Sequence, residues 1–179
     1  MIDEYVLFYI KADVGSLTNI DNVKLADEIL AYQKRRSDDS SSVLFEDTIL
    51  LTPYKSEAKK VIDSMAEIGN NLYNLTIDAN SYWSQIHQPL ESTDLHHHGS
   101  DTCGVLMSWV YYVKTPVNSG DLVFILDDKD SRCLPAKFTP SEGKYIIFPS
   151  YIRHKVSKNL SNDIRICVAG DFSIKNKYK

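Results

Sequence analysis

The sequence predicts a mainly β fold with N-terminal helices (α+β), built around a double-stranded β-helix, the cupin-like jelly roll. Helical periodicity is confined to two segments before residue 76. After that point, about eight short β-like runs follow one another within roughly a hundred residues, a pattern typical of a sandwich or barrel. We expect a single domain over residues 1–179, in which 1–76 form a strand and supporting helices and 77–174 form the β-helix core.

The N-terminal third supplies the strand and the two helices. The start, MIDEYVLFYIKADVG, is predicted to be a first strand, because its apolar run is short and interrupted by charges, which argues against a signal peptide. Segments 21–36 and 56–73 each gather their apolar residues on one helical face, and Ser56 is a good N-cap for the second. Between them, 42–53 has the pattern of one or two strands closed by a proline. Two helices ahead of a sheet can cover one of its faces.

The β-like runs after residue 76 are separated by turn sequences. Glycine, proline, asparagine and aspartate gather in TPVNSGD, DDKDS, TPSEG and KNLSND, as expected of turns. In chain order, the runs are TIDANSYWSQIHQ, the histidine-containing DLHHHGSD, CGVLMSWVYYVK, DLVFIL, CLPAKF, KYIIFP, HKV and DIRICVAGDF.

Composition and charge favour a globular protein that binds neither nucleic acid nor membrane. Hydrophobic residues make up 43% of the chain, charged residues 25%, and the net charge is −4, so no basic surface for nucleic acid is expected. No apolar stretch approaches the length of a membrane span. The three cysteines are odd in number and form no CxxC pair, which argues against a disulfide framework and favours a reducing compartment. We therefore expect a cytoplasmic protein.

Three of the five histidines stand together in DLHHHGSD. If this segment is the end of a strand, His96 and His98 point to one face and His97 to the other, so the first two can chelate one ion. One such pair is weak evidence, because exposed histidines in turns are common. A purification tag is excluded, since the run is internal and short. Two carboxylates are alternative ligands: Asp94 on the same strand face, and Asp101 in the loop just beyond.

A third histidine and an arginine follow in an order that fits one site. His154 comes after a strand and a proline turn, where an antiparallel barrel can bring it beside the strand that carries the His-x-His pair. Further on, Arg165 shares a strand face with Cys167 and Ala169, whose small side chains leave room for a ligand. A surface arginine on an edge strand is the alternative. We expect the remaining histidine, His87, to be packed or hydrogen-bonded within the core.

This order resembles the superfamily of 2-oxoglutarate- and Fe(II)-dependent oxygenases, in which an H-x-D/E motif precedes a distal histidine and then an arginine or lysine. The segment MSWVYYVKTPVNSGDLVFIL is similar to the strands that follow the first motif in these enzymes, and EGKYIIFPSYIRHKVSKNLSNDIRICVAGDF is similar to their closing strands. The resemblance covers residues 80–172 and is greatest to a group found in phages and marine bacteria, related to prolyl 4-hydroxylases. A phage-encoded member would work in the host cytoplasm.

The resemblance implies an enzyme in which His96, His98 and His154 hold Fe(II). Arg165, assisted by Tyr112, would bind the distal carboxylate of 2-oxoglutarate, because a guanidinium binds a carboxylate through two parallel hydrogen bonds. With O₂, such an enzyme couples decarboxylation of 2-oxoglutarate to succinate with oxidation of a substrate, for which a prolyl or other peptide or protein residue is a candidate. The departure from the family pattern is His98, since the common facial triad has two histidines and one carboxylate.

Two other functions stay open at this point. A three-histidine metal dioxygenase of the cupin type would act without 2-oxoglutarate, and Arg165 would then bind a carboxylate of the substrate. A jelly-roll module with a binding or structural role would not be an enzyme at all. Succinate formation that depends on 2-oxoglutarate separates the first function from both alternatives, and metal content separates the module from both enzymes. The sequence does not name the substrate.

Overall fold

The computed structural model describes residues 11–35, 42–44, 56–77, 81–99, 104–127 and 133–174. The predicted order, helices first and short strands after them, is confirmed in these ranges. Most of the expected first strand and most of segment 42–53 lie outside the described residues. The elements are β1 Asp13–Ser16, α1 Asn22–Arg35, β2 Ser42–Leu44, α3 Glu57–Tyr73, β3 Leu75–Thr76, β4 Tyr82–His87, β5 Thr93–His96, β6 Val105–Lys114, β7 Leu122–Asp127, β8 Cys133–Phe138, β9 Lys144–Pro149, β10 His154–Val156 and β11 Arg165–Ile174.

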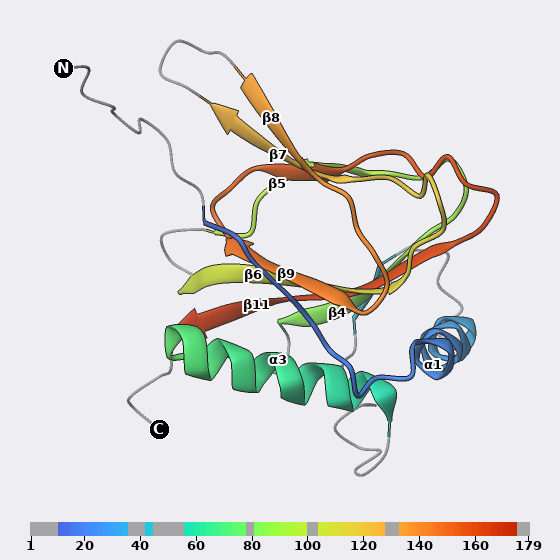
Figure 1. The fold of residues 1–179 in the computed structure, drawn as a ribbon, viewed down its shortest axis with the longest axis horizontal. Helices are drawn as coiled ribbons and strands as arrows, with labels where there is room; N and C mark the ends of the chain where they lie inside the picture. Colours follow the sequence, from blue (N-terminus) through green and yellow to red (C-terminus); the bar gives the residue numbers. More distant parts are fainter. Residues whose placement is uncertain are drawn as a thin grey trace.

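The strands form two antiparallel sheets that lie one over the other (Figure 1). The larger sheet has seven strands in the order β1-β9-β6-β11-β4-β2, with β3 beside β11, and the smaller sheet has the order β5-β10-β7-β8. Most neighbouring strands, other than β7 and β8, are therefore distant in sequence, as in a jelly roll. The inner faces of the two sheets enclose an apolar cluster that includes Leu122 and Phe148, and the candidate site lies between the sheets as well.

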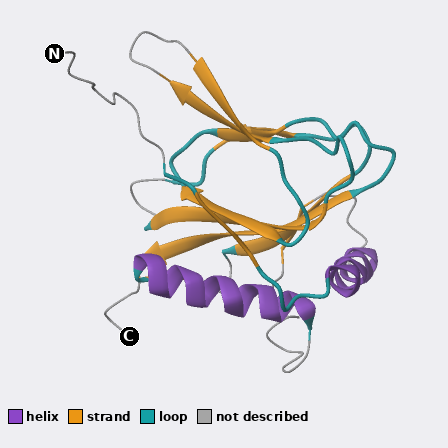
Figure 2. Ribbon diagram, viewed as in Figure 1, coloured by secondary structure: helices purple, strands orange, loops and turns teal. Residues whose placement is uncertain are grey.

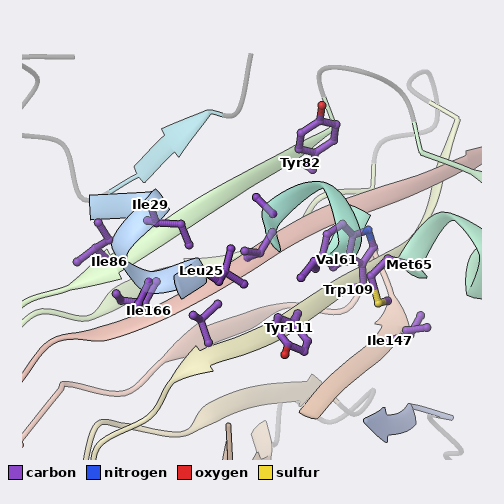
Figure 3. Packing of buried hydrophobic residues seen from close by; sticks show 14 of the residues in the cluster. Leu25, Ile29, Val61, Met65, Tyr82, Ile86, Trp109, Tyr111, Ile147 and Ile166 are labelled. Carbon is purple, nitrogen blue, oxygen red and sulfur yellow. The ribbon is translucent and has the colours of Figure 1, made fainter. Parts of the chain in front are cut away.

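The two helices cover the outer face of the larger sheet (Figure 2). Apolar residues of α1 and α3 pack on those of β4, β6, β9 and β11 in a continuous cluster (Figure 3). Burial of this apolar surface is the main favourable contribution to docking the helices. The labelled members are Leu25, Ile29, Val61, Met65, Tyr82, Ile86, Trp109, Tyr111, Ile147 and Ile166.

Specific contacts fix where α3 begins and how closely it approaches the sheet. Ser56 caps the helix by accepting a hydrogen bond from the Lys59 amide at 3.1 Å. Gly69 faces β11, where an added Cβ would lie 2.4 Å from the Phe172 ring. Glycine inside a helix costs about 1 kcal/mol relative to alanine, and here its lack of a side chain lets helix and sheet touch. Among the described residues, no helix is long and apolar enough to cross a membrane.

Candidate metal centre

Pairing of β5 with β10 brings together two histidines that are far apart in the sequence. His96 and His154 are direct cross-strand partners. His98 lies two residues beyond β5, where its amide donates to the Ser150 carbonyl at 2.9 Å. One ring nitrogen from each of the three histidines lies within 4.8 Å of the others, the one such group of histidine, cysteine or acidic side chains found across the described ranges. This spacing suits a single metal ion.

The second nitrogen of each ring makes a contact that fixes its orientation. His96 donates from Nδ1 to the Asp94 carbonyl at 2.7 Å, and His154 donates from Nδ1 to the Ile152 carbonyl at 2.9 Å. A carbonyl oxygen only accepts, so Nδ1 carries the proton and Nε2 keeps its lone pair. His98 places Nδ1 3.1 Å from a carboxylate oxygen of Asp171, with the same consequence. All three rings therefore present Nε2 as a ligand atom.

Burial keeps the two cross-strand histidines uncharged at neutral pH. It is the largest cause that lowers the pKa of His154 to about 4, against the opposing effect of the Ile152 carbonyl. Burial likewise lowers the pKa of His96, and the neighbouring histidines add to the effect. A neutral imidazole is the form that binds a metal. These two ligands therefore need little deprotonation before an ion enters.

The other candidate ligands of the histidine run are placed differently. His97 is exposed, as strand alternation predicts. The Asp94 side chain is also exposed and does not belong to the three-histidine group, although its carbonyl holds His96. Asp101 lies outside the described residues.

A cavity of about 200 Å³ opens between the sheets beside these rings, and Arg165 lies in its wall. Arg165 is 1% exposed, and its Nε and Nη1 have no hydrogen-bond partner within the described part of the chain. The buried Tyr112 hydroxyl likewise has no partner of normal geometry there, and its ring centroid is 5.5 Å from Arg165 Cζ. A buried cation is costly unless it is paired. The cavity therefore fits an anionic ligand.

The predicted alternation along β11 is confirmed around this arginine. Cys167 and Ala169 also line the cavity, while Ile166 and Val168 belong to the core beneath the helices. Tyr112 lines the cavity with Ser108 and Val110, as expected from its place in β6.

His87 is a buried, hydrogen-bonded residue, as expected. It pairs across the strands with Arg165, and its Nε2 lies 2.8 Å from the Thr93 hydroxyl, which also accepts from Gln85. Burial, and then the charge of Arg165, lower the pKa of His87 to about 4. It is neutral at physiological pH and adds no second cation beside Arg165.

The sequence matches a known protein family over the strands that carry these residues. A family model described as "Putative 2OG-Fe(II) oxygenase" matches residues 81–171, just over half of the 179-residue chain. The chain belongs to this 2OG-Fe(II) oxygenase family. The predicted enzyme class is thereby confirmed, and so are Fe(II) and 2-oxoglutarate as its metal and co-substrate. Among proteins with curated descriptions, none matches the sequence.

Solved structures share the fold of this oxygenase. A Pseudomonas putida prolyl-4-hydroxylase is 16% identical with a TM-score of 0.63, over 90% of this chain and 87% of that chain. A Trichoplax adhaerens prolyl hydroxylase, in complex with a hypoxia inducible factor peptide fragment, is 12% identical with a TM-score of 0.66, over 92% and 84%. The epimerase SnoN, in complex with Fe3+ and alpha ketoglutarate, is 12% identical with a TM-score of 0.62, over 90% and 78%. These similarities confirm the predicted double-stranded β-helix.

Sequence reasoning missed one residue of the oxygenase site, Asp171. It lies in β11, two positions after Ala169, and its side chain touches His98 and Ser108, which both line the cavity. Extending the alternation of Arg165, Cys167 and Ala169 by one more step would have found it. Trp83 also lines the cavity, and it stacks on His98 with ring centroids 5.2 Å apart.

Proposed function

We propose that the oxygenase binds one Fe(II) through His96, His98 and His154 and holds the distal carboxylate of 2-oxoglutarate on Arg165, assisted by Tyr112. The observation that carries this proposal is a buried guanidinium in the same cavity as three ligand-ready imidazoles, with two nitrogens that have no partner among the residues the structure describes. A three-histidine group alone would fit several metal enzymes. The unpaired cation beside it calls for an anionic co-substrate.

Each protein group has a task that its environment explains. Bound Fe(II) would supply the redox chemistry that couples decarboxylation of 2-oxoglutarate to succinate with oxidation of a second substrate by O₂. Arg165 would bind the carboxylate through charge-assisted hydrogen bonds, which are strong where water is excluded. Burial raises the pKa of Tyr112, although the charge of Arg165 opposes the shift, so the hydroxyl stays a donor. The apolar lining, which includes Leu122, Phe148 and Val156, keeps bulk water away.

We also propose a hydroxylase that acts on a peptide or protein residue, with a prolyl residue as the first candidate to test. Support comes from the shared fold with two prolyl hydroxylases, one of them solved with a peptide fragment. In this scheme 77–174 is the catalytic core and 1–76 its support, within one domain. Membership of the phage and marine-bacterial group, and a cytoplasmic location, stay predictions from the sequence.

Anaerobic titration with Fe(II), and then with 2-oxoglutarate, tests the proposal. We expect one iron per chain and a weak visible charge-transfer band that appears only when both are bound. Admission of O₂ should then give succinate, even without the second substrate. Iron binding with neither band nor succinate would favour a three-histidine dioxygenase that does not use 2-oxoglutarate. A chain that binds no metal would fit the non-enzymatic module.

A further inference from the structure

Asp171 is a buried carboxylate with a donor at each oxygen. It is 8% exposed. Its Oδ1 accepts from the Ser108 hydroxyl at 2.7 Å, and its Oδ2 lies 3.1 Å from Nδ1 of His98. Its own amide donates to the Ser81 carbonyl at 2.7 Å. Backbone and side chain are therefore both held, and the carboxylate is a fixed point against which the His98 ring can be set.

The orientation of the His98 ring depends on a side-chain contact, unlike the orientation of the other two histidine rings. His96 and His154 lie within strands and donate to the carbonyl two residues before them. His98 lies beyond the end of β5, and its Nδ1 contacts a side chain 73 residues away in sequence. That carboxylate contacts the edge of its ring, and the indole of Trp83 stacks on its face, nearly parallel at 8°.

We propose that Asp171 is a positioning residue of the metal centre, which fixes the His98 ring with Nε2 toward the metal and supplies the negative charge that three imidazole ligands lack. This inference rests on the proposed function. A common facial triad contributes one carboxylate to the metal. Here the carboxylate would not bind the metal itself. It would bind the histidine that does, in a carboxylate–histidine–metal arrangement that orients and strengthens the ligand.

Two other roles for Asp171 make different predictions. If it were itself a ligand, its oxygens would lie among the three ring nitrogens, but the group within 4.8 Å contains only the histidines. If it only joined β11 to β6 through Ser108, its loss would lower stability and leave metal affinity unchanged.

Metal affinity of the full chain, measured by anaerobic titration of the metal-free protein with Fe(II) and with Co(II), separates these roles. Asp171→Ala should weaken binding by about 10- to 100-fold, the usual cost of losing such a partner. Asp171→Asn should fall between it and the wild type, because the amide oxygen can accept from Nδ1 but carries no charge. Ser108→Ala should weaken binding less than either. Asp163→Asn, an exposed carboxylate paired with Lys114, is the matched control and should bind like the wild type.

A second pair of variants should reverse the effect of Asp171→Asn on metal affinity. In His98→Asp, a carboxylate oxygen takes the place of Nδ1 and faces Asp171 directly, and two carboxylates so close cannot both be ionised without cost. Adding Asp171→Asn should therefore tighten metal binding in the His98→Asp background, whereas it weakens binding in the wild type. If Asp171→Ala does not fold, this comparison and Asp171→Asn decide the question.

The outcomes distinguish this inference from the proposed function. If the wild type binds no metal, or His96→Ala still binds it, the proposed function fails. If the wild type binds metal, but Asp171→Asn and Asp171→Ala both match it, only the role of Asp171 is refuted. The Co(II) absorption bands should keep their pattern in Asp171→Asn. A changed coordination number there would make Asp171 a ligand and overturn the positioning role. A melting-temperature loss without an affinity change would make the residue purely structural.

Discussion

Replacing Arg165 with leucine isolates the proposed co-substrate site from the metal site. The side chain is 1% exposed, and two of its nitrogens have no hydrogen-bond partner in the described part of the chain. It is not a member of the three-histidine group. We therefore expect Arg165→Leu to bind Fe(II) like the wild type and 2-oxoglutarate far more weakly.

The size of the loss follows from the contacts that become impossible. A carboxylate that reaches both Nε and Nη1 would gain two charge-assisted hydrogen bonds in a cavity with a largely apolar lining. Their loss should cost about 2–4 kcal/mol, or about 30- to 1000-fold in affinity. Arg165→Lys keeps the charge but not the planar fork, so its affinity should lie between those of the wild type and the leucine variant.

Two measurements check this expectation. The first is titration of the Fe(II)-loaded protein with 2-oxoglutarate under anaerobic conditions, with iron affinity measured in parallel. The second is the melting temperature of the metal-loaded protein, which 2-oxoglutarate should raise in the wild type and leave nearly constant in Arg165→Leu. Equal 2-oxoglutarate affinity in wild type and Arg165→Leu would refute the assignment of this arginine.

Three further predictions follow from the histidines and their neighbours. His96→Ala should abolish metal binding, while His97→Ala should bind like the wild type in equilibrium dialysis, because the His97 side chain is exposed. Asp94→Ala and Asp101→Ala should each keep one iron per chain by metal analysis, and a loss in either would make that carboxylate the third ligand. His87 stays neutral when folded, because its pKa is lowered to about 4. Below about pH 6.5 the unfolded state therefore binds one more proton than the folded state, and the free energy of unfolding decreases as the pH is lowered. His87→Gln should remove about 2 kcal/mol of the decrease in unfolding free energy between pH 7 and pH 5, measured by urea denaturation.

Local periodicity explains why much of the site could be predicted from sequence. Assumed strand alternation separated His97 from His96 and His98, although β5 itself ends at His96, and it placed Arg165, Cys167 and Ala169 on the cavity face. These conclusions need only the strand assignment. The two helices were predictable for a similar reason, because their apolar residues repeat on one face.

Contacts that depend on long-range register were not predictable in the same way. The cross-strand pairing of Arg165 with His87 follows from the register of β11 with β4, which no local pattern fixes. The approach of Asp171 to His98 needs β11, β6 and the end of β5 to be placed together. The β11–β6 register also shifts at two points along β11, between Ile166 and Cys167 and between Phe172 and Ser173. An aspartate close to the end of the chain has no sequence signal that ties it to a histidine so far before it.

The two proposed subsites lie on different sheets, so their spacing depends on how the sheets pack. His96 and His154 belong to the smaller sheet and Arg165 to the larger one. Phe148, from the larger sheet, meets the His154 ring edge-on, with ring centroids 4.9 Å apart, and makes a similar contact with Phe124 of the smaller sheet. Phe148 thus connects the distal histidine directly to the sheet carrying the arginine.

Phe148→Leu should therefore weaken Fe(II) and 2-oxoglutarate binding together, unlike Arg165→Leu or Asp171→Asn, which each affect one of them. Leucine fills less of the space between the sheets, and the cavity and lost contacts should cost about 1–3 kcal/mol of unfolding free energy. Urea denaturation would measure that loss, and the two titrations would show whether the affinities fall in parallel. If only stability falls while both affinities stay at their wild-type values, the spacing of metal and anion subsites is set by the strands themselves and not by this ring.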